Sequence, residues 1–508
     1  MKKILAYLSG ENGFRSFAML KRLQEKIPVK IYAVIDQGDQ PKKFYEKQKF
    51  VKFEKIWHYN DYVKPLSKPD IKYLKTIEDE FEINLWQISY SDPTFFAFEG
   101  KSYFKEKEIM SLIENDCKLF EKILGEVNPD FLVTHTAGQK QVNILREMCM
   151  SKQIKILQIG GAKFGLRVQV SQHYDVLDKF PKMSKNIIDE NITEEFLEYW
   201  KKELNLTQHY KNMSKHFKNK KIDFVIKTFT NISRIKKESK KQSTNFKQQN
   251  IVKRYLKLYK NNYNRIKRKR FLDAHCTKKI QNESKFVYFP LHMQPEHTTS
   301  VVTPFFTDQI SLIRNIARSL PVNYFLYVKE HPSMGTLRYW REKEYYEKIL
   351  DIPNVRLIHP KVDSLLLIKG AQIVFTINGS VSTEAILFKK KIIVFADVAS
   401  LNVESVIKVE NLEDLPVIIR DVIGRDYSST GVKKFFVEKH NETIEYDPSS
   451  TLLKNIFDKL FVKGIDLPNI TEGAMKEIFE ENSQEIEIWA NEYLRKILQW
   501  EKFGIKND

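Results

Sequence analysis

The sequence predicts an α/β protein made of two similar domains that face each other across a cleft. Strand-like apolar runs alternate with helix-like segments in two separate stretches of the chain, which is typical of parallel sheets covered by helices. A chain of 508 residues also exceeds what one hydrophobic core usually organises. The hydrophobic content of 42% excludes a disordered chain.

In the first stretch, short apolar runs predict strands at 2–8, 29–36, 55–59, 84–90, 130–136 and 154–160, with helices around 14–26, 69–81, 103–126 and 139–151. In the second stretch, strands are predicted at 286–291, 324–330, 354–358, 371–377 and 391–396. Between its first two strands, an amphipathic helix is indicated by the spacing of Ile310, Ile313, Ala317 and Leu320. Both stretches therefore predict right-handed βαβ units, and hence two Rossmann-like sheets.

These patterns divide the chain into a Rossmann-like domain at 1–180, a basic helical insert at 181–280, a second Rossmann-like domain at 281–430 and C-terminal helices at 431–508. Apolar residues at helical spacings near the end of the chain predict that the last helices pack back across the cleft. No repeat of 20–50 residues is present in the sequence.

The net charge of +19 arises within one segment. Residues 211–270 hold 21 Lys and Arg against two acidic residues, and the remainder of the chain is neutral. Three interpretations of this segment stay open: attachment to an anionic membrane surface, which we rank first, an inert solvated insert, and nucleic-acid binding. Nucleic acid is ranked last because no RNA- or DNA-binding motif accompanies the charge.

The three cysteines, Cys117, Cys149 and Cys276, are too few and too widely spaced for a disulfide framework or a zinc site. No apolar run approaches the ~18 residues of a transmembrane helix. The apolar stretch at the start is too short for a signal peptide and predicts a strand instead. We therefore expect a cytoplasmic protein, peripheral at the inner face of the cell membrane.

Three motifs follow predicted strands of the second stretch, where doubly wound sheets bind their ligands. In FPLHMQPEHTT (289–299), His292, Gln294, Glu296 and His297 follow a strand that Pro290 ends. An incidental polar loop is the alternative. In YVKEHPSM (327–334), Lys329, Glu330, His331 and Pro332 follow five apolar residues, and Lys329 and His331 could donate to phosphate oxygens.

The third motif, FTINGSVSTEAIL (375–387), predicts a strand, a tight turn and a helix that begins near Ser382. Gly379 suits the turn, and free backbone N–H groups at the helix start favour an anion. Asn378, Ser380, Ser382 and Thr383 supply polar groups, and Glu384 could accept hydrogen bonds from a ribose. A simple glycine turn with a helix cap is the alternative. Together the three motifs predict a nucleotide-phosphate pocket.

In this order, and with PNVRLI between the second and third motifs, the motifs resemble the capsule-biosynthesis transferases, a GT-B group that includes Kdo transferases. The resemblance covers about 285–398 well and the first 170 residues loosely. It implies a GT-B fold and a donor nucleotide flanked by His331, Pro332, Gly379, Ser380 and Glu384, with Gln294 and Glu296 at the cleft mouth. It also implies a metal-independent glycosyltransferase whose substrate is a CMP-linked acidic sugar such as Kdo or a sialic-acid-like sugar.

The chain departs from this group at Ser382 and Thr383, where the family usually has a small residue and an aromatic one. The resemblance implies a lipid-linked or polymeric glycan as acceptor, bound by the domain at 1–180, and a nucleotide sugar bound by the domain at 281–430. It implies no cofactor beyond this nucleotide-sugar substrate. A teichoic-acid-like polyol-phosphate transferase, a nucleotide-sugar 2-epimerase and a non-catalytic basic binding protein stay open as alternatives. The basic segment counts against an epimerase, which needs no membrane patch.

A catalytic base is expected from the first stretch, where a carboxylate or histidine should face the cleft. The candidates are Asp92, which we rank first, and Glu11 and His135. The sequence contains no strand-end Asp-x-Asp, so it does not indicate a metal-bound donor. Gly160, Gly161 and Gly165 predict a loop whose backbone approaches the substrate closely. Arg167 in this segment is either a ligand for a substrate anion or a surface residue.

Overall fold

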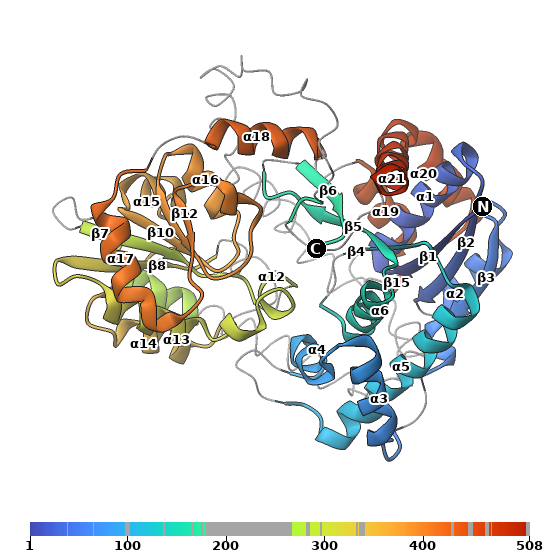
Figure 1. Cartoon of the computed structure of the whole chain (residues 1–508), viewed down its shortest axis with the longest axis horizontal. Coiled ribbons are helices and arrows are strands. Elements are labelled where there is room, and N and C mark those ends of the chain that lie inside the picture. Colours follow the sequence, from blue (N-terminus) through green and yellow to red (C-terminus); the bar gives the residue numbers. More distant parts are fainter. Residues whose placement is uncertain are drawn as a thin grey trace.

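The computed structural model describes residues 1–37, 39–63, 66–96, 102–135, 138–164, 167–173, 176–178, 267–280, 285–294, 297–331, 334, 341–427, 431–445, 451–462, 467–468 and 470–503. Two twisted sheets lie side by side, each with helices on both faces (Figure 1). The predicted α/β fold with two Rossmann-like sheets is confirmed. The predicted domain boundaries stay predictions, and most of the basic insert lies outside the described residues.

The first sheet has the strand order β13-β6-β5-β4-β1-β2-β3. Its strands are β1 (Lys2–Ser9), β2 (Val29–Asp36), β3 (Phe53–His58), β4 (Phe131–His135), β5 (Lys155–Gly161), β6 (Arg167–Ser171) and β13 (Ile444–Glu445). The five strands β1 to β5 run parallel, and β6 pairs antiparallel with both β5 and β13. Alternate residues of β1 enter the hydrophobic clusters on opposite faces of the sheet, as burial on both sides requires.

The second sheet is parallel throughout and has the strand order β12-β11-β10-β7-β8-β9. Its strands are β7 (Lys285–Pro290), β8 (Tyr324–Lys329), β9 (Val355–Ile358), β10 (Ile373–Thr376), β11 (Lys391–Val394) and β12 (Val406–Lys408). Every predicted strand of this half is present, and β12 was not predicted.

The helices of the first half are α1 (Gly10–Lys26), α2 (Asp39–Lys47), α3 (Ile71–Phe81), α4 (Leu85–Ser91), α5 (Glu106–Val127) and α6 (Lys140–Ser151), with a 3-10 turn η1 (Tyr59–Asp61). The prediction of a strand at 84–90 is wrong, because this segment is α4. Asn84 caps the helix by accepting a hydrogen bond from Gln87 N at 2.8 Å. Leu85 and Ile88 then fall on one buried face, three residues apart.

The helices of the second half are α12 (His297–Ser300), α13 (Gln309–Ser319), α14 (Lys343–Leu350), α15 (Ser364–Gly370), α16 (Val381–Leu387) and α17 (Leu415–Gly424). Residues 267–275 are also helical. Three 3-10 turns complete this half: η2 (Pro304–Phe306), η4 (Ala399–Asn402) and η5 (Leu412–Asp414). The predicted amphipathic helix is α13, whose N-cap Asp308 accepts from the backbone N–H groups of Ile310 and Ser311.

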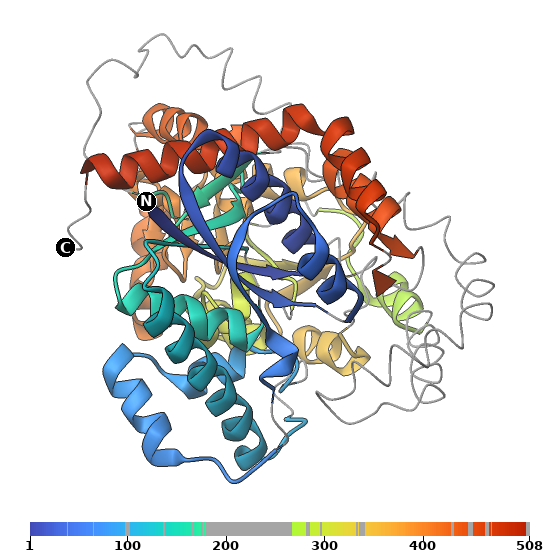
Figure 2. The same ribbon diagram turned by 90° about the vertical axis from the view of Figure 1, so that its right-hand side faces the viewer.

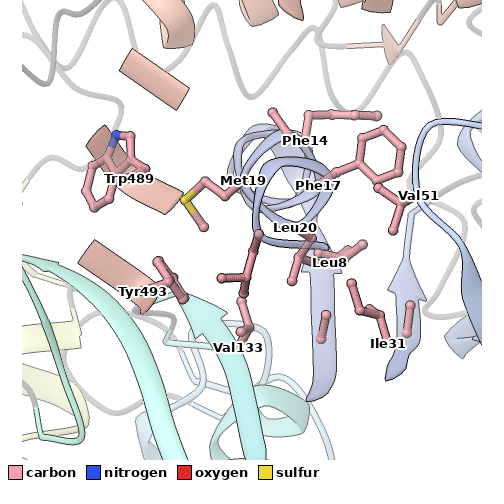
Figure 3. Packing of buried hydrophobic residues seen from close by; sticks show 14 of the residues in the cluster. Leu8, Phe14, Phe17, Met19, Leu20, Ile31, Val51, Val133, Trp489 and Tyr493 are labelled. Carbon is pink, nitrogen blue, oxygen red and sulfur yellow. The ribbon is translucent and has the colours of Figure 1, made fainter. Parts of the chain in front are cut away.

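The C-terminal segment is α18 (Val432–Asn441), α19 (Thr451–Leu460), the hairpin of β14 (Phe461–Val462) and β15 (Leu467–Pro468), α20 (Glu472–Glu481) and α21 (Ser483–Phe503). The chain here returns to the first half, where α20 and α21 cover the sheet (Figure 2). Trp489 and Tyr493 of α21 are buried beside Met19 of α1 (Figure 3). The C-terminal helices therefore complete the core of the first half.

The carboxyl edges of the two sheets face each other. Lys163, which follows β5, donates a hydrogen bond to the carbonyl oxygen of Asn378, which follows β10, at 2.6 Å. His135 ends β4, and His297, after β7, is close enough to lower its pKa. Ligand-binding edges of both sheets are thus directed at one another. Of the helices that the structure describes, none is both long and apolar enough to cross a membrane.

Candidate functional site

The candidate nucleotide site lies at the carboxyl edge of the second sheet. Strands β8 and β10 are the two neighbours of β7, so the residues that follow them meet around one strand end. Lys329 is the last residue of β8, and Asn378 and Gly379 form the turn between β10 and α16. The second and third motifs of the sequence are therefore brought together, as predicted from their positions after strands.

Lys329 and Glu384 are the two buried charges of this site. Among the described residues, Lys329 Nζ donates one hydrogen bond, to Ser364 Oγ at 2.7 Å. Burial lowers the pKa of Lys329 to about 8, although Asp363 and Glu384 oppose the shift. Burial raises the pKa of Glu384 to about 7, and its Oε1 accepts from Ser380 Oγ at 3.4 Å. Both groups keep capacity for a ligand that carries an anion and hydroxyls.

The turn after β10 is built against His292. The backbone N–H of Ile377 donates to His292 Nε2 at 3.1 Å, so this nitrogen carries no proton. The hydroxyl of Thr376, 3.1 Å from the same nitrogen, then donates to it while accepting from Gly379 N at 3.0 Å. Burial lowers the pKa of His292 to about 3, which keeps the ring neutral in this role. His292 is thus a positioning residue for the turn.

Asn378 and Gly379 line this turn for different reasons. Asn378 is 1% exposed, and within the described part of the chain its Nδ2 has no hydrogen-bond partner. A Cβ atom on Gly379 would lie 2.7 Å from Thr376 Oγ1 and 3.0 Å from His292 Cε1, so only glycine fits. The requirement is close approach of neighbours and not a left-handed backbone, since the φ of Gly379 is not positive. The unpaired amide of Asn378 favours a ligand at the turn.

Lys163 brings a second ammonium group to the same turn from the first half. Its Nζ donates to both the carbonyl oxygen and Oδ1 of Asn378. Its charge also lowers the pKa of His292. Sequence reasoning missed Lys163, because Asn378 lies 215 residues further along the chain. The one available signal was its place in the glycine-containing segment after a strand.

Two predicted ligand-binding residues instead have structural partners. Gln294 donates from Nε2 to the carbonyl oxygen of Thr307 at 2.7 Å and accepts from Gln309 at 2.7 Å. Glu330 is paired with the buried Arg341, and it accepts from Tyr346 at 2.6 Å. Glu330 is the first residue after β8, and its carboxylate is occupied by Arg341 and Tyr346. The structure gives both residues a role in holding the loops behind the site.

Burial and the neighbouring cations Arg341 and Lys329 lower the pKa of His331 to about 4, with burial the larger cause and Glu330 opposing the shift. His331 is neutral at pH 7 and would donate to phosphate without a positive charge. In the helix start, Ser382 Oγ donates to the carbonyl oxygen of Gly379 at 2.9 Å, and Thr383 is buried. Pro332 and Glu296, also predicted here, lie outside the described residues.

The candidate catalytic bases of the first half differ in whether their side chains already accept hydrogen bonds from the protein. Asp92 follows helix α4 and not a strand, which corrects the reason for ranking it first. Its Oδ1 accepts from Thr94 N at 2.7 Å and its Oδ2 from Lys140 N at 2.9 Å, so it caps α6. Glu11, in the first turn of α1, is only half-buried, and no described residue pairs with its carboxylate.

His135 is buried at the end of β4, with Nε2 3.3 Å from Ser9 Oγ. Its Nδ1 has no partner among the described residues. Burial, together with Arg15 and His297, lowers its pKa to about 4, so it is unprotonated but only weakly basic at pH 7. Of the two candidate carboxylates, Asp92 is occupied by backbone N–H groups, whereas Glu11 has no hydrogen-bond partner among the described residues. Which candidate is the base stays a prediction.

The glycine segment after β5 also differs from the prediction. Gly160 and Gly161 belong to strand β5 and pair with β6, so they are not in a loop. Arg167 donates to Thr443 Oγ1 at 2.7 Å and to the carbonyl oxygen of His440 at 2.8 Å, which ties α18 to the first sheet. Gly165 lies outside the described residues.

The three cysteines are free and buried. In the part of the chain that the structure describes, no group of three or more His, Cys, Asp and Glu residues could hold a metal ion. Two Rossmann-like sheets with facing carboxyl edges, joined by helices that return to the first, make this a GT-B-like α/β fold.

No family model matches the chain, and no curated protein matches it. Solved structures do match its fold. A UDP-GlcNAc 2-epimerase from Neisseria meningitidis is 13% identical, with a TM-score of 0.26, over 86% of this chain and 99% of that one. The β-Kdo 2,7 transferase of KpsC from Thermosulfurimonas dismutans is 10% identical, with a TM-score of 0.30, over 80% and 98%.

The β-Kdo 2,4 transferase of the same KpsC is 9% identical, with a TM-score of 0.32, over 68% of this chain and 86% of that one. Identities and TM-scores this low are no basis for assigning an activity.

Proposed function

We propose that the chain is a metal-independent glycosyltransferase that moves a sugar from a nucleotide donor to a capsular or surface-glycan acceptor. The observation that supports this best is the group of Lys329, Glu384 and Asn378 at neighbouring strand ends, with Lys163 supplied from the facing half. Ammonium groups at a buried site suit the phosphate of a leaving nucleotide. A carboxylate and an unpaired amide beside them suit ribose hydroxyls and a base.

In the proposed reaction an acceptor hydroxyl attacks the anomeric carbon of the donor sugar while Glu11 takes the hydroxyl proton. The bond between that carbon and the phosphate oxygen breaks, and the nucleotide leaves with the electron pair. Lys329 and Lys163 then bind the negative charge that develops on the phosphate. The motif resemblance favours a CMP-linked acidic sugar such as Kdo.

The proposal is tested first by nucleotide binding. CMP, UDP and GDP and their sugars are titrated calorimetrically into wild type and Lys329→Met. Loss of a charge-assisted hydrogen bond costs about 1.5–3 kcal/mol, or roughly 10- to 150-fold in Kd. Lys391→Met is the matched control, because Lys391 begins β11 at the opposite edge and donates to the carbonyl oxygen of Ile423. The proposal fails if no nucleotide binds, or if the two variants weaken binding equally.

Product analysis by mass spectrometry then separates the activities. A transferase releases free nucleotide and extends a glycan only when an acceptor is present. A 2-epimerase would change the donor sugar without acceptor. A polyol-phosphate transferase would release the nucleoside monophosphate and add the polyol together with its phosphate to the acceptor. Nucleotide binding without any product under these conditions would indicate a non-catalytic binding protein.

A further inference from the structure

A cavity of about 110 Å³ with both polar and apolar lining residues lies in the first half, apart from the proposed nucleotide site. Helices α5 and α6, which contribute residues to its lining, lie next to each other in Figure 1, and Asp92 and Thr94 of the lining follow α4. It lies at the carboxyl edge of the first sheet, between the ends of β2 and β3 and the start of α6, and is partly open to solvent. One water needs about 10–15 Å³ by the same measure, so the cavity has room for several waters or a small ligand.

Buried charges form one wall of the cavity. Lys140, at the start of α6, is ion-paired with Asp116 of α5, and both side chains are at most 5% exposed. Tyr59 donates its hydroxyl hydrogen to Asp116 Oδ1 at 2.6 Å, and its oxygen lies 3.3 Å from Lys140 Nζ. A buried ion pair is weak as a source of stability because both charges lose their water. Its presence beside a cavity favours a role in binding.

Asp36, Gln141 and Asn115 form a second part of the polar lining, and Asp92 and Thr94 complete it. Asp36 Oδ2 accepts from Tyr7 OH at 2.7 Å and from Gln141 Nε2 at 3.0 Å. The Nδ2 atom of Asn115 is buried, and no described residue accepts a hydrogen bond from it. An unpaired buried donor costs about 1–3 kcal/mol unless a ligand or water satisfies it. The lining thus offers hydrogen-bond donors and acceptors on several sides of one small space.

The charge of the lining selects the ligand. Asp36, Asp92 and Asp116 outnumber the single ammonium of Lys140. Excess negative charge at a low-dielectric site repels phosphates, carboxylates and hence nucleotides. Hydroxyl groups, which donate to carboxylates and accept from amides, match this lining without any charge. The nucleotide site in the second half, with Lys329 and Lys163, has the opposite preference.

We propose that this cavity binds a neutral, polyhydroxylated group, a sugar ring or short polyol. That this group belongs to the acceptor rests on the proposed function, whereas the binding of a neutral sugar does not. An acidic first-half site and a cationic second-half site would hold the two substrates on opposite sides of the facing edges. The cavity would then select acceptors by the hydroxyls of a neutral residue.

The test uses the full chain and methyl glycosides of glucose, galactose, mannose and N-acetylglucosamine as probes, with saturation-transfer NMR as the measurement. We expect at least one probe to bind, and Gln141→Leu and Asn115→Leu to weaken its binding at least tenfold. Gln139→Leu is the matched control, because Gln139 is exposed two residues earlier and is not in the lining. Its binding should equal that of wild type.

Thermal melting is the control that checks whether the variants are folded. Asn115→Leu removes an unpaired donor from helix α5, so it should melt no lower than wild type while losing the sugar. The proposal is overturned if no probe binds, if both cavity variants bind as wild type, or if CMP and UDP displace the sugar. The calorimetric titrations with nucleotides decide the proposed function separately, since they read the second half.

Discussion

Lys163 of the first half donates a hydrogen bond from Nζ to the carbonyl oxygen of Asn378 in the second half, at 2.6 Å. Lys163 has a φ of 52°, in the left-handed region that residues other than Gly, Asn and Asp rarely adopt. Such a backbone costs of order 1–3 kcal/mol and persists only where its surroundings fix it. The loop after β5 is thus shaped to direct this ammonium across to the turn of the proposed nucleotide site.

Lys163→Met should weaken nucleotide binding about tenfold, because a neutral side chain of similar length removes one cation from the phosphate site. Calorimetric Kd values for the best-binding nucleotide check this. Lys152→Met, at an exposed position after α6, is the control and should bind as wild type. Equal affinities for all three proteins would show that Lys163 only joins the two halves.

Nucleotide affinity should fall as the pH rises above about 8. Burial lowers the pKa of Lys329 to about 8, so Lys329 is charged below that pH and neutral above it. A phosphate binds the charged form, and the limiting loss is about 1.4 kcal/mol, or tenfold, per pH unit. Titrations at pH 7 to 9.5 measure it. Lys329→Arg stays charged and should flatten the profile, so a slope unchanged in that variant assigns the pH dependence elsewhere.

Gly379→Ala should lower the free energy of unfolding by about 1–3 kcal/mol and weaken nucleotide binding. Its Cβ would displace Thr376 Oγ1 and His292 Cε1, which lie 2.7 and 3.0 Å from that position. Gly379→Val should do more harm than Gly379→Ala. Denaturant unfolding and calorimetry measure the two effects. In the control Gly424→Ala, the new Cβ meets nothing within 4 Å, so neither quantity should fall.

Most strands of the two sheets could be predicted from sequence because they are short apolar runs, and the central ones are buried on two faces. The short strands β6, β12 and β13 were not predicted. The segment 84–90 could not be assigned in this way. Its alternating and helical patterns are equally good, and the Asn84 cap together with Glu78 Oε1, which accepts from Leu85 N at 3.0 Å, decides for a helix. The error mattered for function, because it placed Asp92 at a strand end.

Pairings between distant segments explain the other differences. Strand β13 pairs Ile444 with Val168, and no local pattern at either position indicates it. The sequence located the groups at the ends of β8 and β10, because residues after parallel strands share an edge. It did not reveal which of them are already paired. Glu330 and Arg341 form an ion pair, and only the folded chain shows that Glu330 is thereby occupied.

Asp92→Ala should destabilise the protein by about 0.5–2 kcal/mol, because it removes the acceptor for Thr94 N and for Lys140 N at the start of α6. Glu11→Gln should instead leave stability unchanged and lower kcat at least a hundredfold, with nucleotide affinity intact. Chemical unfolding and steady-state kinetics give the two quantities. If Asp92→Asn melts as wild type but is inactive, Asp92 is the base and Glu11 is not.

We propose that the basic segment 211–270 attaches the protein to an anionic membrane surface. Its last four residues are described: Lys267, Lys269 and Arg270 are exposed, whereas Arg268 is buried and donates to the carbonyl oxygen of Arg341. Changing the three exposed residues to Gln should weaken binding to phosphatidylserine vesicles, most at low salt, and leave nucleotide affinity unchanged. Co-sedimentation with the vesicles at two salt concentrations measures this binding.

Arg268→Gln is the control. Alone it should lower the melting temperature without changing vesicle binding, which separates the effect of surface charge from that of folding. If wild type ignores these vesicles but binds RNA in a salt-sensitive way, the segment serves nucleic acid instead.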